Sequence, residues 1–436
     1  MDRITKSYIQ KLLSILAFSL IIFSIGCEKE KIADNIDNDD QKSEVEIINE
    51  KIYESMQDIY LWNDSLPDIA PSDYDTPEEF LSALRYQPID KWSYIMSTTE
   101  FNQYFDQGEY LGHGILIALD NEENIRIGFV YKNTQAYQEG IRRSWIIKKI
   151  DGTDVTPENV NSLLGSSEEA ITNTILFLDG DENEKEIQLT KETVKINAVL
   201  HSETIEQDSK KIGYVVFQEF ISTANNELKT VFEEFSSQSI DELIIDLRYN
   251  GGGLNSVAEY FASWIAGNKS SSVFYKLLHN EENESRNVTV NFSGNVDALN
   301  LNRIFFITTN GSASASELLI NGLKPYYDVK LVGSNTSGKP VGMYAISFRN
   351  YDYTLVPISF KYVNAQDVGD FYDGLTVDYP AEDDKTHMFG DPEESSLKEA
   401  LSQISRGLSV KSATIPTETK ILSPSRSGVN QFLRAY

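Results

Sequence analysis

Residues 303–339 read RIFFITTNGSASASELLINGLKPYYDVKLVGSNTSGK, and this pattern determines how we expect the second half of the chain to fold. An apolar run typical of a buried strand leads through a serine-rich turn into a helix-forming segment, and a second apolar run ends in glycine and lysine. Two strands joined by one helix predict a right-handed crossover between parallel neighbours. The loops after both strands therefore open at the same edge of a sheet, where α/β folds place their sites.

The same alternation of strand and helix extends toward the N-terminus. The runs IGYVVFQEF and ELIIDLR are typical of strands, whereas NNELKTVFEEF and LNSVAEYFASWI are typical of helices. The glycine-rich turn NGGG, residues 250–253, begins one residue after the strand predicted at residues 242–248. We therefore predict an α/β core over residues 196–410, with a mostly parallel sheet and crossover helices.

Serine and lysine side chains that could act together follow the strands of this core. Ser312, Ser314 and Ser316 come after one strand, and Lys339 comes after the next. A serine needs a base to become a nucleophile, and a lysine can be that base when burial lowers its pKa. None of the four histidines lies beside these loops in the sequence. Backbone N–H groups at the helix start and in the glycine-rich turn could stabilise an oxyanion.

A nucleotide-binding loop is the alternative interpretation of residues 333–340. Their sequence GSNTSGKP matches seven of the eight positions of G-x-x-x-x-G-K-[ST]. That motif needs a hydroxyl after the lysine and a helix whose first N–H groups point at the phosphates. Here Pro340 offers neither a hydroxyl nor an N–H, and the continuation VGMYAISF favours a strand. The sequence therefore argues against phosphate binding.

Three segments, DLRYNGGG, NGSASASELL and SGK, resemble the signature segments of the C-terminal processing, or tail-specific, serine peptidases. The resemblance implies a ClpP/crotonase-like α/β catalytic core coupled to a PDZ domain. It further implies a Ser-Lys dyad in which Ser314 is the nucleophile and Lys339, 25 residues later, is the general base. The other residues implied are the oxyanion-hole donors Gly252 and Ala315, with Gly253 as the alternative glycine, and the supporting carboxylate Glu317.

Each of these segments also has a purely structural explanation. A serine-rich helix start is commonly only a cap, and a triple glycine only a turn. We interpret Asp246 and Arg248 as a structural pair. One departure from the family concerns Met343, which stands where relatives often have Gln or Glu bonded to the lysine. A thioether is a poor acceptor, so Met343 is not part of the predicted site.

Residues 106–195 contain short strands and turns. The stretches YLGHGILIA and GIRRSWIIKKIDGTDV resemble a PDZ domain, although Ser144-Trp145 replaces the usual Gly-Asp. The resemblance implies that a substrate's C-terminal carboxylate binds a backbone loop while the peptide adds as a strand beside it. The loop implied consists of Leu111, Gly112, His113 and Gly114.

The N-terminal part of the sequence predicts that the protein is exported, and it predicts a small helical domain after the export signal. An apolar run ends at Cys27, the sole cysteine, and resembles a bacterial lipoprotein signal over residues 1–27, with Cys27 as the lipidated residue. The alternative is an ordinary signal peptide or membrane anchor. Residues 28–45 are acidic and read as a tether. Residues 46–105 predict a helical domain or a helical extension packed on its neighbour, with one helix capped by Thr76.

The amino-acid composition limits the kinds of molecule that this protein is expected to bind. With 67 acidic and 38 basic residues the net charge is −29, which repels nucleic acid and anionic membranes. No His, Cys or acidic residues have metal-ligand spacing, so no cofactor is expected.

We expect an exported, lipid-anchored serine endopeptidase of the bacterial cell envelope that cleaves unfolded or C-terminally exposed proteins. The alternatives are a catalytically weak PDZ-containing peptide-binding lipoprotein and a structural envelope lipoprotein. Residues 411–436 read as a C-terminal tail.

Overall fold

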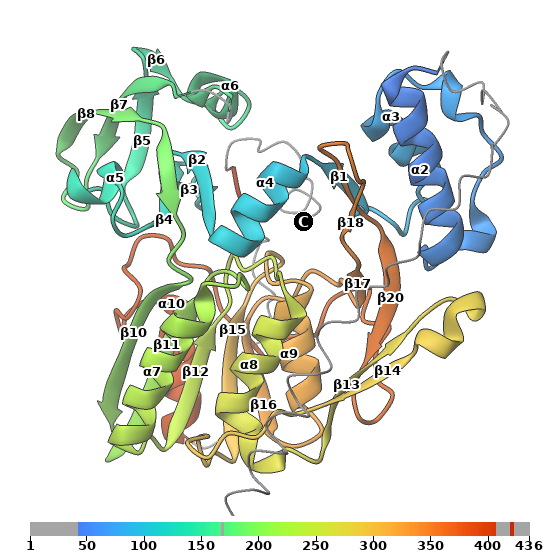
Figure 1. Cartoon of the computed structure of the whole chain (residues 1–436). Helices are drawn as coiled ribbons and strands as arrows, with labels where there is room; N and C mark the ends of the chain where they lie inside the picture. The colour runs from blue at the N-terminus through green and yellow to red at the C-terminus, as the bar shows by residue number, and fades with distance from the viewer. Residues whose placement is uncertain (1–41, 167–169, 407–418, 423–436) are drawn as a thin grey trace, which may run out of the picture. The chain divides into compact units, whose positions relative to one another are not determined.

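A six-stranded sheet forms the centre of the computed structural model, which describes residues 42–166, 170–406 and 419–422 (Figure 1). The strands lie in the order β10-β11-β12-β15-β16-β21. Neighbours from β11 to β21 are parallel, whereas β10 is antiparallel to β11. The bounds are β10 Val199–Gln207, β11 Lys210–Phe217, β12 Glu242–Asp246, β15 Arg303–Thr308, β16 Asp328–Gly333 and β21 Tyr379–Pro380.

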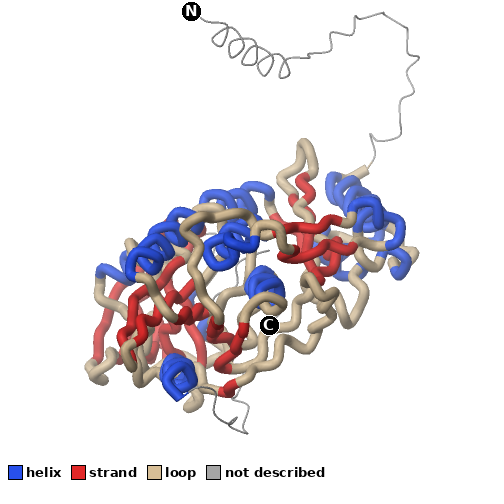
Figure 2. The backbone as a smooth tube through the Cα atoms, turned by 90° about the horizontal axis from the view of Figure 1, so that it is seen from below, coloured by secondary structure: helices blue, strands red, loops and turns tan. Residues whose placement is uncertain are grey.

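Helices cover both faces of this sheet, so its strands are buried on both sides and read as continuous apolar runs. In β12, Leu243 and Ile245 pack toward three helices on one face, whereas Ile244 packs toward a fourth helix on the other. Figure 2 shows strands lying between helices on either side. The three helices are α7 Ala224–Gln238, α8 Asn255–Ala266 and α9 Ala315–Leu323, and the fourth is α10 Ser395–Arg406.

A smaller antiparallel sheet with a core of its own precedes the central sheet in the sequence. Its order is β3-β4-β5-β7-β8, so β3 stands at one end, and the short β6 pairs with β5. The strands β2 and β9 form a separate antiparallel pair. The bounds are β2 Glu109–Gly112, β3 Ile115–Leu119, β4 Ile125–Val130, α5 Gln135–Gln138, β5 Ile146–Ile150, β6 Thr153–Asp154, α6 Val160–Leu164, β7 Thr172–Leu178, β8 Glu184–Thr190 and β9 Glu192–Lys195.

The N-terminal helices share a hydrophobic core with the second half of the chain. Side chains of α2 and α3 pack with Val341, Leu355 and Ile358, and β1 pairs antiparallel with β19. Further strands extend this region in the order β14-β13-β20-β17, and β18 pairs with β19. The bounds are α2 Glu44–Ile59, α3 Pro77–Leu84, β1 Tyr94–Met96, α4 Thr98–Asn102, β13 Val273–Leu278, β14 Val288–Asn291, β17 Val341–Met343, β18 Ile346–Ser347, β19 Thr354–Val356 and β20 Ile358–Val363.

The N-terminal cap of α3 forms as the sequence predicts. Thr76 Oγ1 accepts the N–H of Glu79 at 3.2 Å, and Pro77 is the first residue of α3, so the predicted cap is confirmed.

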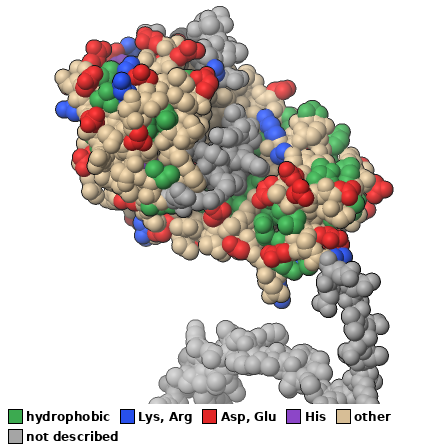
Figure 3. All heavy atoms as spheres, turned by 90° about the horizontal axis from the view of Figure 1, so that it is seen from above, with side chains coloured by type: hydrophobic (Ala, Val, Ile, Leu, Met, Phe, Trp, Pro, Cys, Tyr) green, Lys and Arg blue, Asp and Glu red, His purple; other side chains and the backbone are tan. Residues whose placement is uncertain are grey.

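Acidic side chains are spread over the face seen in Figure 3, in keeping with the net charge of −29. Within the described part of the chain, no helix is long and apolar enough to cross a membrane. Cys27 lies outside the described residues, so its lipidation stays a prediction.

Candidate active site

Ser314 stands at the point where β15 has ended and α9 begins. Its φ of 53° and ψ of −113° are unusual for a residue with a side chain, and a backbone held this way stores strain. The side chain is almost buried, with 7% of its residue surface exposed. Strain of this kind gathers at functional sites, where the surrounding contacts keep the backbone in place.

Those contacts come from the segment after β12, which runs from Leu247 into the glycine-rich turn. The N–H of Ala313 donates to the carbonyl of Asn250 at 3.0 Å, and Ser316 Oγ donates to the same carbonyl at 3.1 Å. Ser312 Oγ donates to the carbonyl of Leu247 at 2.7 Å. The serines on either side of Ser314 therefore hold the turn, which leaves Ser314 as the serine that faces the pocket described below.

Glu317 joins the serine turn to the lysine loop. Its Oε2 accepts the N–H groups of Ser314 at 3.0 Å and Lys339 at 2.8 Å. Its Oε1 accepts Thr336 Oγ1 at 2.6 Å and the N–H of Gly338 at 2.7 Å. Burial raises the pKa of Glu317, although these four hydrogen bonds oppose the shift because they favour the carboxylate. The predicted supporting residue thus contacts both halves of the predicted dyad.

Lys339 is fully buried, with none of its surface exposed. Burial lowers its pKa to about 7, and the negative charges of Asp90 and Glu317 oppose that shift. At pH 7 about half of the lysine side chains with this pKa are neutral and can accept a proton, whereas an ordinary lysine is almost fully protonated. Its Nζ lies 3.3 Å from Met343 Sδ, so the methionine occupies the position beside the amine.

Two neighbours of Lys339 were absent from the predicted site. Met343 was set aside on chemical grounds, yet its sulfur contacts the amine. Asp90 comes from the N-terminal segment, where its carboxylate accepts the hydroxyls of Tyr60 and Ser93, both at 2.6 Å. Asp90 also accepts the backbone N–H groups two and three residues later, as an aspartate in a turn commonly does. The sequence around Asp90 therefore indicated a turn and gave no sign of an effect on Lys339.

The predicted oxyanion donors lie together beside Ser314. A Cβ added to Gly252 would lie 2.8 Å from Ser314 Cβ and 2.9 Å from the nitrogen of Ala315, so the loop can approach this closely only without a side chain. The N–H of Gly252 donates to Asn250 Oδ1 at 2.9 Å. Gly253, in contrast, lines the pocket together with Ser314. Of the two glycines, Gly253 is therefore the better placed to donate to a ligand.

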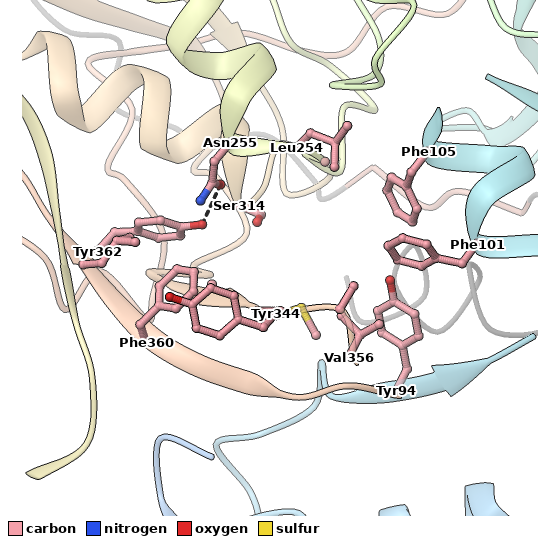
Figure 4. Close-up of a pocket in the computed structure, with 15 residues that line it drawn as sticks. Tyr94, Phe101, Phe105, Leu254, Asn255, Ser314, Tyr344, Val356, Phe360 and Tyr362 are labelled. Carbon is pink, nitrogen blue, oxygen red and sulfur yellow. Dashed lines mark hydrogen bonds between the residues drawn. The ribbon is translucent and has the colours of Figure 1, made fainter. Parts of the chain in front are cut away.

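An apolar pocket of about 260 Å³ opens beside Ser314. Figure 4 shows aromatic rings around it from three parts of the chain, with Phe101 and Phe105 on one side and Tyr344, Phe360 and Tyr362 on another. Tyr362 donates its hydroxyl to Asn255 Oδ1 at 2.7 Å, so these two polar atoms pair with each other at the wall. Such a lining suits an extended peptide segment with a large apolar side chain.

Asp246 and Arg248 belong to a buried network behind the glycine-rich turn, in keeping with the structural role that we assign to them. Arg248 pairs with Asp246 at 2.6 Å, Glu394 at 2.7 Å and Asp383 at 3.2 Å. Arg143, from the loop before β5, joins Asp383 at 3.3 Å. The network therefore ties the smaller sheet to the central one.

The predicted carboxylate loop, Leu111 to Gly114, is tied to neighbouring strands by backbone pairing. Leu111 and Gly112 belong to β2 and pair with β9, and the carbonyl of Gly114 accepts the N–H of Tyr131 at 2.8 Å. His113 is buried, and that burial lowers its pKa to about 4, so it is neutral at pH 7. None of the four loop residues lines the pocket beside Ser314. In the described part of the chain, no three His, Cys, Asp or Glu side chains gather as metal ligands would.

Known proteins resemble this chain in sequence and in fold. Residues 211–380 match Peptidase family S41, and residues 47–94 match the Peptidase S41 N-terminal domain, so that the two segments together span half of the chain. The "Probable CtpA-like serine protease" of Staphylococcus epidermidis is 26% identical over 261 residues, which are 58% of this chain and 50% of the relative. Its Staphylococcus aureus counterpart is also 26% identical, over 260 residues, 58% of this chain and 49% of that protein.

The chain thus spans about half the length of the curated relatives that it matches. Among solved structures, the Bacteroides fragilis protein designated "Putative S41 protease" has a TM-score of 0.69 and 24% sequence identity. The alignment covers 81% of this chain and 97% of that one, which shows a shared fold.

Proposed function

Since the chain belongs to peptidase family S41, we propose that it is a serine endopeptidase with Ser314 as nucleophile and Lys339 as general base. The observation that carries the proposal is the buried amine of Lys339, whose pKa of about 7 suits proton transfer at neutral pH. Burying a lysine costs stability, and a residue with only a structural role gains nothing from that cost. The backbone of the same lysine is bound to that of Ser314 through Glu317.

The reaction has two halves that use the same pair. In the first, Lys339 Nζ takes the proton of Ser314 Oγ while Oγ bonds to the carbonyl carbon of the peptide bond. The tetrahedral intermediate collapses, the carbon–nitrogen bond breaks, and the Lys339 ammonium protonates the leaving amine. In the second, Lys339 deprotonates a water that attacks the Ser314 ester, and the proton returns to Oγ as the acid half leaves.

Backbone N–H groups stabilise the oxyanion in each half. Ala315 is the first residue of α9, where N–H groups have no partner within the helix and the helix dipole favours negative charge. The N–H of Gly253 is the second donor, because that of Gly252 already serves Asn250. Donors fixed in this way are worth roughly 3 kcal/mol of barrier each.

The substrate is an unfolded protein segment with an apolar side chain near the cleaved bond. The aromatic lining of the pocket beside Ser314 supports this choice. We further propose that the smaller sheet acts as a PDZ domain, with the loop of Leu111 to Gly114 binding the C-terminal carboxylate and the substrate strand adding to β3. Export and anchoring through Cys27 complete the proposal, which places the enzyme in the bacterial cell envelope.

A peptide-binding protein with weak catalysis is the second candidate. The contact between Lys339 Nζ and Met343 Sδ favours it, because a thioether orients an amine less firmly than an oxygen acceptor does. The two candidates differ in turnover and agree in peptide binding.

Cleavage of an unfolded protein with an apolar C-terminus, followed by mass spectrometry, separates them. The wild type should produce fragments, whereas Ser314→Ala and Lys339→Ala should not, although both should bind the substrate. Binding without cleavage by any of the three would establish the second candidate. Equal cleavage by all three would mean that the reaction occurs elsewhere.

A further inference from the structure

A short segment near the C-terminus occupies the outer edge of β3. The N–H of Leu119 donates to the carbonyl of Lys420 at 2.9 Å, and the N–H of Leu422 donates to the carbonyl of Ile117 at 2.8 Å. Between these bonds, Ala118 and Ile421 form an antiparallel bridge. Because β3 stands at the end of its sheet, residues 419–422 extend that sheet by one short bridged segment.

The direction of this segment is the one that an added peptide would take. Lys420 lies opposite Leu119 and Leu422 lies opposite Ile117, so the segment runs toward the start of β3. The loop of Leu111 to Gly114 immediately precedes that start. A substrate whose C-terminus bound this loop and whose strand paired with β3 would need the same backbone groups. The segment and such a substrate exclude each other.

Side-chain contacts also hold the segment on the core of the smaller sheet and on the central part of the protein. Thr419 Oγ1 donates to Asp383 Oδ2 at 3.0 Å, and Asp383 also accepts the hydroxyl of Tyr249 at 2.7 Å. Leu422 packs against the core of the smaller sheet. Ile421 packs against the central core, where its Cδ1 lies 3.4 Å from the position of a Cβ on Gly311. Gly311 is three residues before Ser314, so the segment touches the turn that carries the proposed nucleophile.

We propose that residues 419–422 are a ligand within the chain for the β3 edge, which incoming peptides must displace before they bind. The inference rests on the proposed function, because it assumes that substrates pair with β3. A ligand on the same chain acts at an effective concentration on the order of millimolar. A peptide can bind only those molecules whose β3 edge is open, so its apparent Kd is the intrinsic Kd divided by the open fraction. If one molecule in ten has an open edge, the apparent affinity falls about tenfold.

The test measures peptide binding to the full chain carrying Ser314→Ala, so that nothing is cleaved. The probe is a fluorescein-labelled peptide that ends in Thr-Lys-Ile-Leu with a free carboxylate, and binding is followed by fluorescence anisotropy. Leu422→Pro removes the N–H that donates to Ile117, and it should tighten binding of the probe by about tenfold. Lys420→Ala is the matched control, because the side chain of Lys420 is exposed and its carbonyl remains. Its affinity should stay unchanged.

The outcomes distinguish this inference from the proposed function. Equal affinity in the parent, Leu422→Pro and Lys420→Ala would overturn the inference while leaving peptide recruitment intact. If no variant binds the probe, recruitment at β3 is wrong and the inference falls with it. Hydrogen exchange of β3 provides the second measurement. The amide of Leu119 should exchange faster in Leu422→Pro than in the Lys420→Ala control, and unchanged protection would mean that the segment does not cover the edge.

Discussion

The backbone N–H groups of Ser314 and Lys339 donate to the same oxygen of Glu317. The two bonds, of 3.0 Å and 2.8 Å, hold the nitrogens within 5.8 Å of each other, the sum of the two lengths. One buried carboxylate therefore fixes the spacing of two residues that lie on different loops. The positioning acts through the two backbone N–H groups and not through the side chains of Ser314 and Lys339.

Replacing that carboxylate should separate positioning from chemistry. In Glu317→Gln the amide nitrogen cannot accept hydrogen bonds, so some of the four donors lose their partner. We expect a loss of about 1–3 kcal/mol in the free energy of unfolding and a fall in kcat that exceeds any rise in KM. Urea unfolding and steady-state kinetics measure both. The exposed Glu54→Gln is the control, and a Glu317→Gln variant that matched it in kcat would contradict the positioning role.

Under the proposed mechanism, activity should rise with pH through a midpoint near 7, because only a neutral Lys339 amine can accept the proton of Ser314. The negative charge of Asp90 raises the pKa of Lys339, in opposition to burial. Asp90→Asn should therefore move the midpoint of kcat/KM to lower pH, whereas the exposed Asp64→Asn should leave it in place. An unchanged or higher midpoint in Asp90→Asn would show that Asp90 does not act on the base.

Lys339→Met should abolish turnover and yet stabilise the fold, because it removes a buried amine. The folded pKa of about 7 lies below the usual 10.5, so the unfolded chain binds more protons between these values. The free energy of unfolding of the wild type should therefore rise from pH 7 to 10.5 through this residue. Urea unfolding across that range should show a smaller rise for Lys339→Met than for Ser314→Ala. Equal slopes would count against a lowered pKa.

Met343→Gln should give Lys339 an oxygen acceptor in place of the sulfur now 3.3 Å away. An amide oxygen stabilises the ammonium form, so the pKa of Lys339 should rise and the midpoint of kcat/KM should move to higher pH, by up to about one unit. The pH profile of Met343→Leu, which has no acceptor, is the comparison. Identical midpoints in the two variants would mean that residue 343 does not contact the amine during turnover.

Gly252→Ala should lower kcat by about 100-fold, because the added Cβ would press on Ser314 and Ala315. The matched control is Gly152→Ala. Both glycines have a positive φ, +77° at Gly152 and +104° at Gly252. A Cβ added to Gly152 would have no other atom within 4 Å. Both variants bear backbone strain, and only the first crowds the serine. Similar kcat values for the two would show that crowding at Gly252 is unimportant.

The sequence was most informative where the fold is built from local patterns. The strand, turn and helix around Ser314 and the loop of Lys339 follow from hydrophobic periodicity and glycine placement, and the structure brings both residues to one carboxylate. Asp90 could not be inferred in this way, because its effect on Lys339 depends on how distant segments pack. The hydrogen bond from Gly252 to Asn250 depends on a side-chain orientation that glycine spacing does not encode.

The pairing of residues 419–422 with β3 could not be predicted from the sequence either. Four residues are too few to show a period, and the surrounding Ser, Thr and Pro suggested only a tail. The pairing is set by the open edge of β3, which is a property of the folded sheet.

The shared core of the N-terminal helices has a consequence for the order in which the protein becomes competent. The N–H of Ile358 donates to Ser93 Oγ across 265 positions of sequence, and Ser93 also binds Asp90. Contacts of such high separation close late, because the loop between them must be closed first. The environment of Lys339 is therefore completed only after residue 358 of the 436 has been synthesised. Under the proposed mechanism, a nascent chain would therefore carry Ser314 before the surroundings of its proposed base, Lys339, are complete, and it should stay inactive until then.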